Sequence, residues 1–280
     1  MKLVVESGSS KADWAVISHG KVLSCFQTKG FNPLFFEEIE IKQFLLDHEQ
    51  IHSIIGDIRQ VYFYSPGFSH RDSRNNLHNI LESVFKKSNI YIESDLLAAC
   101  RSVYHSQSLF VSILGTGSNT AFYDGQSMQQ ITPSLGFILA DEGSGAALGR
   151  TLLRDYFRKQ LPEDIYLSFS KSHSISLERV LSSVYKEEYP NRFLASYVPF
   201  LSQYLAHDYV QNILRKEFQK YFNTQLLVHP MHADFTISFV GSVAFFFKDV
   251  LRQIALENGI KVSEIIQSPI NGLVDYHLRN

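Results

Sequence analysis

The chain has 280 residues, of which 45% are hydrophobic and 19% are charged, and its formal net charge at pH 7 is −2. This composition is typical of a globular protein that is long enough for one large domain or two modest ones. The near-zero charge gives no basic surface for nucleic acid, and no apolar run approaches membrane-spanning length, so we expect neither partner. Because the first residues lead into a strand pattern and not into a signal peptide, we expect a cytoplasmic protein.

The two cysteines, Cys25 and Cys100, are far apart in the sequence and form no CxxC motif. This arrangement argues against a zinc or iron–sulfur site built from cysteine. Apolar neighbours predict that both are buried free thiols.

The first hundred residues alternate between strand and helix patterns. Strands are expected at residues 3–5, 12–18, 21–28, 59–65 and 89–93, and helices at 36–55, at 72–85 and from Asp95 onward. This order predicts an α/β fold with a partly parallel sheet. Asn32 lies in a Gly-Phe-Asn-Pro turn; its amide would suit sugar hydroxyls, but spacing alone favours a plain turn residue.

Asp95 comes directly after a predicted strand and begins a predicted helix. In α/β sheets this is where ligand clefts form, and a carboxylate there could accept a proton from a substrate hydroxyl. An aspartate that only caps the helix would occupy the same position. The local sequence does not decide between these two interpretations.

Residues 110–123 predict a hairpin whose loop, Gly115-Thr116-Gly117-Ser118-Asn119, consists of glycine, hydroxyl and amide residues. An ordinary hairpin turn is the simpler explanation of one such loop. A similar arrangement, with the loop Glu6-Ser7-Gly8-Ser9-Ser10-Lys11, stands at the N-terminus. The repeat, about a hundred residues apart, predicts two similarly built halves, each with a loop that can approach a phosphate closely.

After the hairpin comes a glycine-rich segment at residues 141–145. An apolar run ends in Asp141 and Glu142, and then Gly143, Ser144 and Gly145 precede a helix to about residue 159. The acids would suit the first turn of a helix, but the glycines exceed what a cap needs. We therefore expect a loop that binds an anion or a polar ligand at the helix N-terminus.

Residues 162–221 carry helical patterns at 177–185, 192–205 and 209–222, with many aromatic residues and no catalytic constellation. We expect these aromatics in the core or, second, in a subunit interface, which makes a homodimer the expected oligomer. The rest of the chain predicts a strand at 234–240, the pair Gly241-Ser242, a helix at 243–255, a strand at 261–266 and a short terminal helix.

Six segments in this order resemble the N-acetylglucosamine kinase group of the BadF/BadG/BcrA/BcrD ATPase family, within the actin/hexokinase/Hsp70 superfamily. The segments are residues 8–14, 30–33, 94–99, 115–119, 141–145 and 239–244. The resemblance implies an α/β fold of two ribonuclease-H-like (actin-like ATPase) domains around a cleft that binds ATP, Mg²⁺ and a sugar. The implied domains are residues 1–106 and 107–267, with a helical insert at about 160–230 and a terminal helix at 268–280 that packs back on the first domain.

The resemblance also implies a role for individual residues. Asp95 would be the general base that takes the proton from the 6-hydroxyl of N-acetylglucosamine, and Glu6 would position Mg²⁺. The implied sugar-binding residues are Asn32, Thr116, Asn119, Gly136 and Asp141. The implied ATP-binding residues are Ser9, Ser10, Lys11, Gly115, Thr116, Gly117, Gly241 and Ser242.

This chain departs from the family pattern at Glu6 and Ser7, where the family usually has Asp-Gly, and at Ala140, where it often has glycine. Glutamate keeps the charge but is one methylene longer, which shifts its oxygens relative to a metal. A nucleotide-binding regulator with little or no turnover is therefore the alternative function. An ATPase that activates a dehydratase or reductase is a third reading, which the positions of Cys25 and Cys100 disfavour because such ATPases carry a cysteine-bound iron–sulfur cluster.

Overall fold

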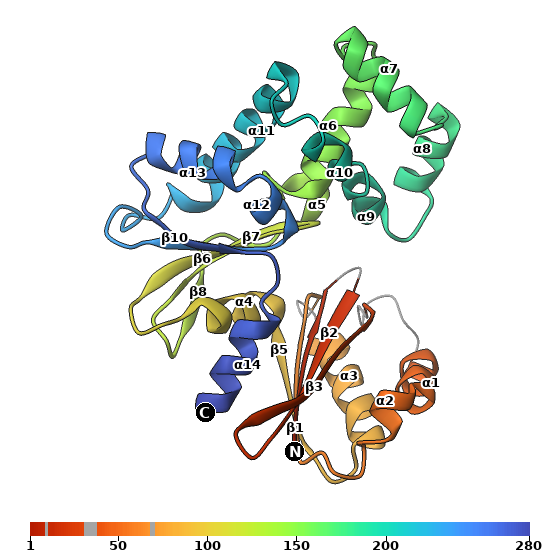
Figure 1. The fold of residues 1–280 in the computed structure, drawn as a ribbon, viewed down its shortest axis with the longest axis vertical. Helices are drawn as coiled ribbons and strands as arrows, with labels where there is room; N and C mark the ends of the chain where they lie inside the picture. The colour runs from red at the N-terminus through yellow and green to blue at the C-terminus, as the bar shows by residue number, and fades with distance from the viewer. Residues whose placement is uncertain (9–10, 31–37, 68–70) are drawn as a thin grey trace. The chain divides into compact units, whose positions relative to one another are not determined.

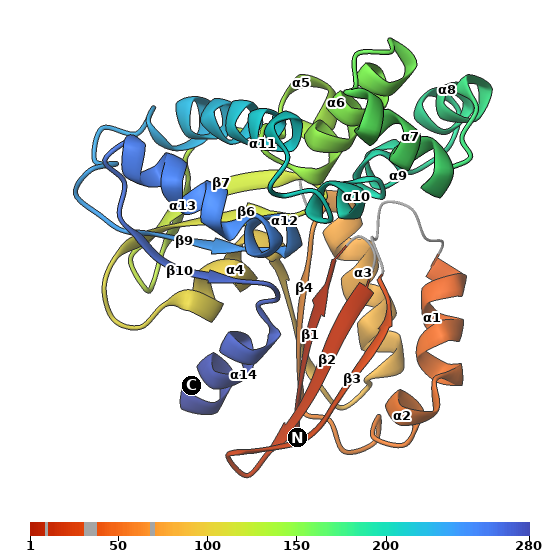
Figure 2. The same cartoon turned by 45° about the horizontal axis from the view of Figure 1, so that its top comes forward.

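The computed structural model describes residues 1–8, 11–30, 38–67 and 71–280 (Figures 1 and 2). The chain forms two compact units: Met1–Tyr104 together with Pro269–Asn280, and His105–Ser268. The chain therefore leaves the first unit after Tyr104 and returns to it for the C-terminal helix.

The first unit is built on a five-stranded sheet with the order β3-β2-β1-β4-β5. Strand β1 pairs antiparallel with β2 and parallel with β4. The strands are β1 (Lys2–Ser7), β2 (Lys11–Ser18), β3 (Lys21–Lys29), β4 (Gln60–Ser65) and β5 (Asn89–Ser94). The helices are α1 (Glu38–Asp47), α2 (Glu49–His52), α3 (Arg71–Val84), α4 (Asp95–Val103) and α14 (Ile270–Arg279).

Alternation along β1 and β2 separates the two faces of this sheet, because successive side chains of a strand point to opposite faces. Leu3, Val5 and Trp14 pack in one apolar cluster with residues of α1 and α3. Val4 and Ala15 pack in another with residues of α4 and α14. Helices therefore cover both faces, as an α/β sheet requires.

The second unit repeats the same strand order. Its sheet runs β8-β7-β6-β9-β10, and β6 pairs antiparallel with β7 and parallel with β9. The strands are β6 (Leu109–Leu114), β7 (Ser118–Tyr123), β8 (Met128–Gln130), β9 (Ile237–Val240) and β10 (Val262–Ile266). The predicted α/β fold class, with two similarly built halves, is confirmed.

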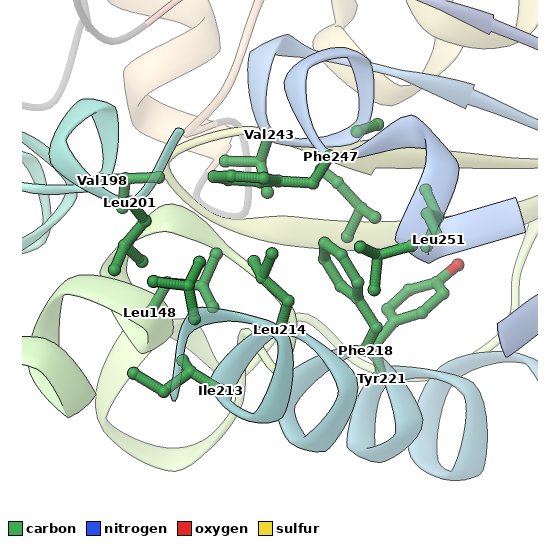
Figure 3. Packing of buried hydrophobic residues seen from close by; sticks show 14 of the residues in the cluster. Leu148, Val198, Leu201, Ile213, Leu214, Phe218, Tyr221, Val243, Phe247 and Leu251 are labelled. Atoms are coloured by element: carbon green, nitrogen blue, oxygen red, sulfur yellow. The ribbon is translucent and has the colours of Figure 1, made fainter. Parts of the chain in front are cut away.

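Nine α-helices and one π-helix of the described chain belong to the second unit. They are α5 (Gly136–Leu139), α6 (Gly145–Phe157), α7 (Glu163–Ser172), α8 (Leu177–Tyr185), α9 (Pro190–Ala195), α10 (Val198–Ser202), α11 (Asp208–Tyr221), η1 (Phe222–Leu226), α12 (Ser242–Phe246) and α13 (Lys248–Glu257). Figure 3 shows Leu214, Phe218 and Tyr221 extending from α11 toward Phe247 and Leu251. The residues between α6 and β9 thus share one core with the rest of the unit.

Three predicted helices are shorter than expected. The helix predicted at 36–55 is interrupted at His48, whose ψ of 110° is extended, and the one at 243–255 is interrupted at Phe247. The helix predicted at 192–205 is likewise divided into α9 and α10. The break between α9 and α10 is followed by Pro199, which lacks the N–H that would continue α9, whereas the breaks at His48 and Phe247 contain neither glycine nor proline.

The prediction of two buried cysteines is half wrong. Cys100 is buried, but Cys25 is exposed. Cys25 lies on β3, the edge strand, most of whose side chains face solvent. Its apolar neighbours did not reveal this edge position.

Candidate active site

Asp95 is the first residue of α4, immediately after β5 ends at Ser94. The N-cap is Ser94, whose Oγ accepts a hydrogen bond from the Leu97 amide at 3.1 Å. Asp95 Oδ1 accepts a hydrogen bond from the Leu96 amide at 2.8 Å, and no other residue in the described part of the chain donates a hydrogen bond to Oδ2. The interpretation of Asp95 as the helix cap is therefore wrong, and one carboxylate oxygen has no partner there.

Glu6 and Asp13 face each other across the β1–β2 hairpin. Glu6 is two residues after Val4 on β1, and Asp13 is two residues before Ala15 on β2. Because side chains two apart on a strand point to the same face, Glu6 and Asp13 lie on the face of Val4 and Ala15, which pack with Ala98 of α4. Strand alternation thus directs Glu6 and Asp13 to the side of the sheet that carries α4.

The charges of these carboxylates affect one another. Burial raises the pKa of Glu6 to about 8, with further contributions from the nearby charges of Asp95 and Asp13, while Lys11 lowers it. Burial likewise raises the pKa of Asp95 to about 6, against the hydrogen bond from Leu96. Perturbed carboxyl groups that cluster at a strand–helix junction are typical of catalytic sites.

The first glycine loop is held against its neighbouring strand. Gly8 donates a backbone hydrogen bond to the Lys11 carbonyl at 2.9 Å. A β-carbon on Gly30 would lie 2.3 Å from the Gly8 carbonyl oxygen. Gly30 itself therefore lies against the Gly8–Lys11 turn, because only glycine permits this approach.

Lys11 lies at the end of that loop and pairs with a buried carboxylate. Its Nζ is 3.0 Å from Asp13 Oδ2, and its side chain is 52% exposed. The other oxygen of Asp13 accepts a hydrogen bond from Gln27 Nε2 at 2.5 Å. The ammonium group thus lies at the surface beside the buried Asp13 carboxylate, where it can also contact an anion from solvent.

The carboxylates of the first unit fit a magnesium ion of the kind that binds with phosphate. Mg²⁺ prefers oxygen ligands and is usually held by one or two carboxylates together with substrate phosphates. Within residues 1–8, 11–30, 38–67 and 71–280, no three His, Cys, Asp or Glu side chains form a complete metal cage. A cation near Glu6 would offset the repulsion from Asp95 and Asp13 that raises its pKa.

The second glycine loop offers two consecutive backbone N–H groups. Gly115 donates to the Gly117 carbonyl at 3.0 Å, which closes the turn between β6 and β7. The amides of Thr116 and Gly117 make no hydrogen bond to any residue that the structure describes. Successive free N–H groups in a tight turn form an anion-binding concavity, so this loop fits a phosphate.

Asp141 lies against this loop and has a backbone conformation unusual for its type. Its φ is +62°, its side chain is buried, and its Oδ1 accepts a hydrogen bond from the Ser118 amide at 3.3 Å. Burial and the charge of Glu142 raise the pKa of Asp141, while Ser118 and Arg150 lower it. A buried carboxylate held in the left-handed region indicates a functional constraint.

The helix N-terminus after Asp141 is not free to bind an anion, contrary to the sequence-based prediction. The amides of Gly145 and Ala146 donate to the carbonyls of Gly115 and Thr116 at 2.8 and 3.1 Å. The amide of Ala147 donates to Ser144 Oγ at 3.2 Å. The first N–H groups of α6 therefore hold the glycine loop in place instead of a ligand.

The remaining candidate residues of the second unit lie at element ends. Gly241, with a φ of +127°, follows β9, and a β-carbon there would lie 2.4 Å from the Leu114 carbonyl oxygen. Ser242 begins α12 and is exposed. Asn119 Oδ1 accepts hydrogen bonds from the Thr120 amide and from Gln130 Nε2. Gly136, with a φ of +74°, begins the exposed helix α5.

Comparison with solved structures decides the family. Over 100% of its length this chain is 34% identical to the proposed N-acetylglucosamine kinase from Porphyromonas gingivalis, covering 99% of that chain with a TM-score of 0.93. The chain belongs to the family of that protein.

Two more distant structures share its fold. The proposed N-acetylglucosamine kinase from Chromobacterium violaceum is 14% identical, with 98% of each chain covered and a TM-score of 0.66. The ROK family glucokinase from Streptomyces griseus, solved with glucose and AMPPNP, is 14% identical, with 98% of this chain and 97% of that chain covered and a TM-score of 0.60. Neither a protein-family model nor a curated protein sequence matches the chain.

Three of the candidate residues, Ser9, Ser10 and Asn32, lie outside the described residues. The family relationship leaves the roles of the other candidates as proposals. Asp13 is the residue that sequence reasoning missed. The available signal was a charged residue inside the otherwise buried run of β2.

Proposed function

We propose that this protein is an ATP-dependent kinase that phosphorylates the 6-hydroxyl of an N-acetylated amino sugar, with N-acetylglucosamine as the first candidate. The observation that carries the proposal is Asp95: a carboxylate at a strand–helix junction with one unbonded oxygen and a pKa raised to about 6. Such a group is ionised at neutral pH and basic enough to accept a hydroxyl proton. The 34% identity to a proposed N-acetylglucosamine kinase supports the choice of sugar.

In this proposal Asp95 Oδ2 would accept the proton of the sugar 6-hydroxyl as that oxygen bonds to the terminal phosphorus of ATP, while the bond from that phosphorus to the bridging oxygen breaks and ADP leaves. Asp95 Oδ1 remains bonded to the Leu96 amide, which fixes the orientation of the carboxylate. Positioning and charge neutralisation dominate phosphoryl transfer, so the orientation of this base contributes to the rate.

ATP with Mg²⁺ would supply the phosphoryl group and its electrophilic activation. Glu6 would hold the ion, and Lys11, Ser9 and Ser10 would contact phosphate from the first loop. The free amides of Thr116 and Gly117 support a phosphate position at the second loop. Gly241 and Ser242 would accommodate the adenosine.

On the sugar side we assign Asn32, Thr116, Asn119, Gly136 and Asp141. Asp141 is supported by its burial and its constrained backbone. A carboxylate fixed in this way can accept hydrogen bonds from sugar hydroxyls and reject substrates that lack them.

Three broader assignments complete the proposal. The six ordered motifs support an assignment to the BadF/BadG/BcrA/BcrD ATPase family, and we expect a cytoplasmic homodimer. We also retain residues 1–106 and 107–267 as its two functional domains. In the part of the chain that the structure describes, no helix has the length and apolarity needed to span a membrane.

The test is ADP release by purified protein with Mg-ATP, measured with each of N-acetylglucosamine, N-acetylmannosamine and glucosamine. We expect stimulation by an N-acetylated sugar and its loss in Asp95→Asn. If no sugar stimulates ADP release and Asp95→Asn changes nothing, the protein is not this kinase.

Glu6 supports one alternative, a nucleotide-binding regulator of the same fold. Its long side chain and pKa of about 8 are unusual for a metal ligand at neutral pH. ATP binding without a phosphorylated product, and no gain of turnover in Glu6→Asp, would favour the regulator.

A further inference from the structure

Tyr221, the last residue of α11, is fully buried. Its hydroxyl lies 3.0 Å from Thr120 Oγ1, although the two residues are 101 positions apart in the sequence. Thr120 Oγ1 donates to Ser112 Oγ at 3.3 Å, and Ser112 Oγ donates to the Asn119 carbonyl at 3.1 Å. We call Tyr221, Thr120 and Ser112 the hydroxyl relay.

The direction of the relay follows from counting protons. Each hydroxyl has one proton to donate. Ser112 gives its proton to Asn119 and Thr120 gives its proton to Ser112, so Tyr221 must be the donor to Thr120. All three residues have 0% exposure, so bulk solvent does not reach the relay.

The ring of Tyr221 also contacts the turn that carries Asp141. A β-carbon on Gly143 would lie 2.9 Å from the Tyr221 β-carbon and 3.5 Å from its Cγ. Gly143 has a φ of +73°, and this close packing leaves no room for a side chain there. Tyr221 is therefore in contact with the Asp141 turn through its ring and with the Asn119 strand through its hydroxyl.

A second contact comes from the π-helix η1, which follows Tyr221. Gln225, four residues on and buried, accepts a hydrogen bond from Thr132 Oγ1 at 2.8 Å. Residues four apart in a helical segment lie on the same side, and π-helical turns are frequent at functional sites. Two side chains of the helical insert thus bond to the segment between Asn119 and Gly136.

We propose that Tyr221 is a positioning residue for the amino sugar, which it orients by fixing the backbone of Asn119 and the turn of Asp141. This inference rests on the proposed function, because Asn119 and Asp141 are its sugar-side residues. It gives the helical insert a specific role beyond filling the core.

Tyr221→Phe tests the relay, because it removes the hydroxyl and keeps the ring. The matched control is Tyr209→Phe on the same helix, whose hydroxyl donates to Asp155 Oδ2 at 2.9 Å and has no contact with the relay. We expect Tyr221→Phe to lower kcat/KM for the sugar about tenfold through a raised KM, the effect of roughly one hydrogen bond. The KM for ATP should change less than about twofold, and Tyr209→Phe should leave both KM values unchanged.

Hydrogen–deuterium exchange of peptides that contain residues 115–120 and 143–147 provides a readout that needs no activity. We expect faster exchange of both peptides in Tyr221→Phe and not in Tyr209→Phe. Thr120→Val, which removes the middle hydroxyl at nearly constant shape, should have the same effects, and the double variant should be no worse than either single one. Thr120→Val decides the question if Tyr221→Phe does not fold.

If Tyr221→Phe and Thr120→Val keep the wild-type KM for the sugar and the wild-type rates of hydrogen–deuterium exchange, the positioning role is overturned. The kinase proposal then remains intact. Equal effects on the KM for sugar and for ATP would also overturn the positioning role. A wild-type chain that phosphorylates no sugar would overturn the proposed function and, with it, the sugar role of Tyr221.

Discussion

A β-carbon placed on Gly117 would lie 2.9 Å from Oδ2 and 3.3 Å from Cγ of Asp141. Asp141 cannot easily move away, because it is buried and its backbone is held at a φ of +62°. The Asp141 carboxylate can therefore occupy its position only because residue 117 has no side chain.

We therefore expect Gly117→Ala to displace Asp141 and to lower kcat/KM for the amino sugar by about ten- to a hundredfold, since small misplacements of a binding group have effects of this order. Steady-state kinetics with the sugar varied at saturating ATP measures this. Gly56→Ala is the control, because nothing lies within 4 Å of its β-carbon position. An unchanged kcat/KM for the sugar in Gly117→Ala would contradict the sugar role of Asp141.

Gly30→Ala should affect the other loop. Its new β-carbon would lie 2.3 Å from the Gly8 carbonyl oxygen and 2.8 Å from the Lys11 amide nitrogen, and both are backbone atoms that cannot rotate away. We expect a raised KM for ATP and a stability loss of about 1–3 kcal/mol, which is typical of overpacking. Nucleotide binding by calorimetry and a denaturant titration measure the two effects, and wild-type ATP affinity in a destabilised variant would contradict a phosphate role for this loop.

Asp95→Asn should remove the general base and lower kcat by about 10²- to 10⁴-fold, the range for general base catalysis. In the wild type, kcat/KM should fall as the pH drops through about 6, because protonated Asp95 cannot accept the substrate proton. A pH–rate profile measures this, and a profile that is flat through that region would exclude Asp95 as the base.

The same carboxylate should make the wild type less stable at neutral pH. The folded pKa of about 6 lies above the ordinary value of 3.8, so the folded state binds more protons than the unfolded state between these values. Stability therefore falls as the pH rises through this window. We expect Asp95→Asn to melt at a higher temperature than the wild type at pH 7, whereas a lower Tm would point to a structural role.

His277 of α14 should have the opposite pH dependence. Its Nε2 lies 2.9 Å from the Tyr64 hydroxyl, and burial, Arg101 and Lys2 lower its pKa from 6.5 to about 3. Because the unfolded state binds more protons in this range, stability is lost as the pH falls below 6.5. His277→Gln should flatten the fall in Tm from pH 7 to pH 5, whereas His78→Gln, at a partly exposed position, should not. An equal fall in the wild type and His277→Gln would contradict this role.

Much of the fold could be predicted because its signals are local. The strands, the two hairpin loops and the α/β class follow from alternation and from glycine positions. The breaks at His48 and Phe247 could not be predicted, since neither residue is a glycine or proline that would end a helix by itself.

The candidate site was less predictable for a physical reason. Ser94 and Asp95 are both good caps, so only the structure shows that Ser94 is used and that Asp95 Oδ2 has no partner among the described residues. The hydrogen bonds from Gly145 to Gly115, and from Tyr221 to Thr120, join segments far apart in the chain. Local sequence patterns do not encode such pairs.

The most direct test of the kinase proposal is the identity of the product. Protein incubated with Mg-ATP and N-acetylglucosamine should give the sugar 6-phosphate and ADP in a 1:1 ratio by mass spectrometry and ³¹P NMR, and Asp95→Asn should give neither. ADP formation at the same rate with and without sugar, with no phosphorylated sugar detected, would contradict the proposal.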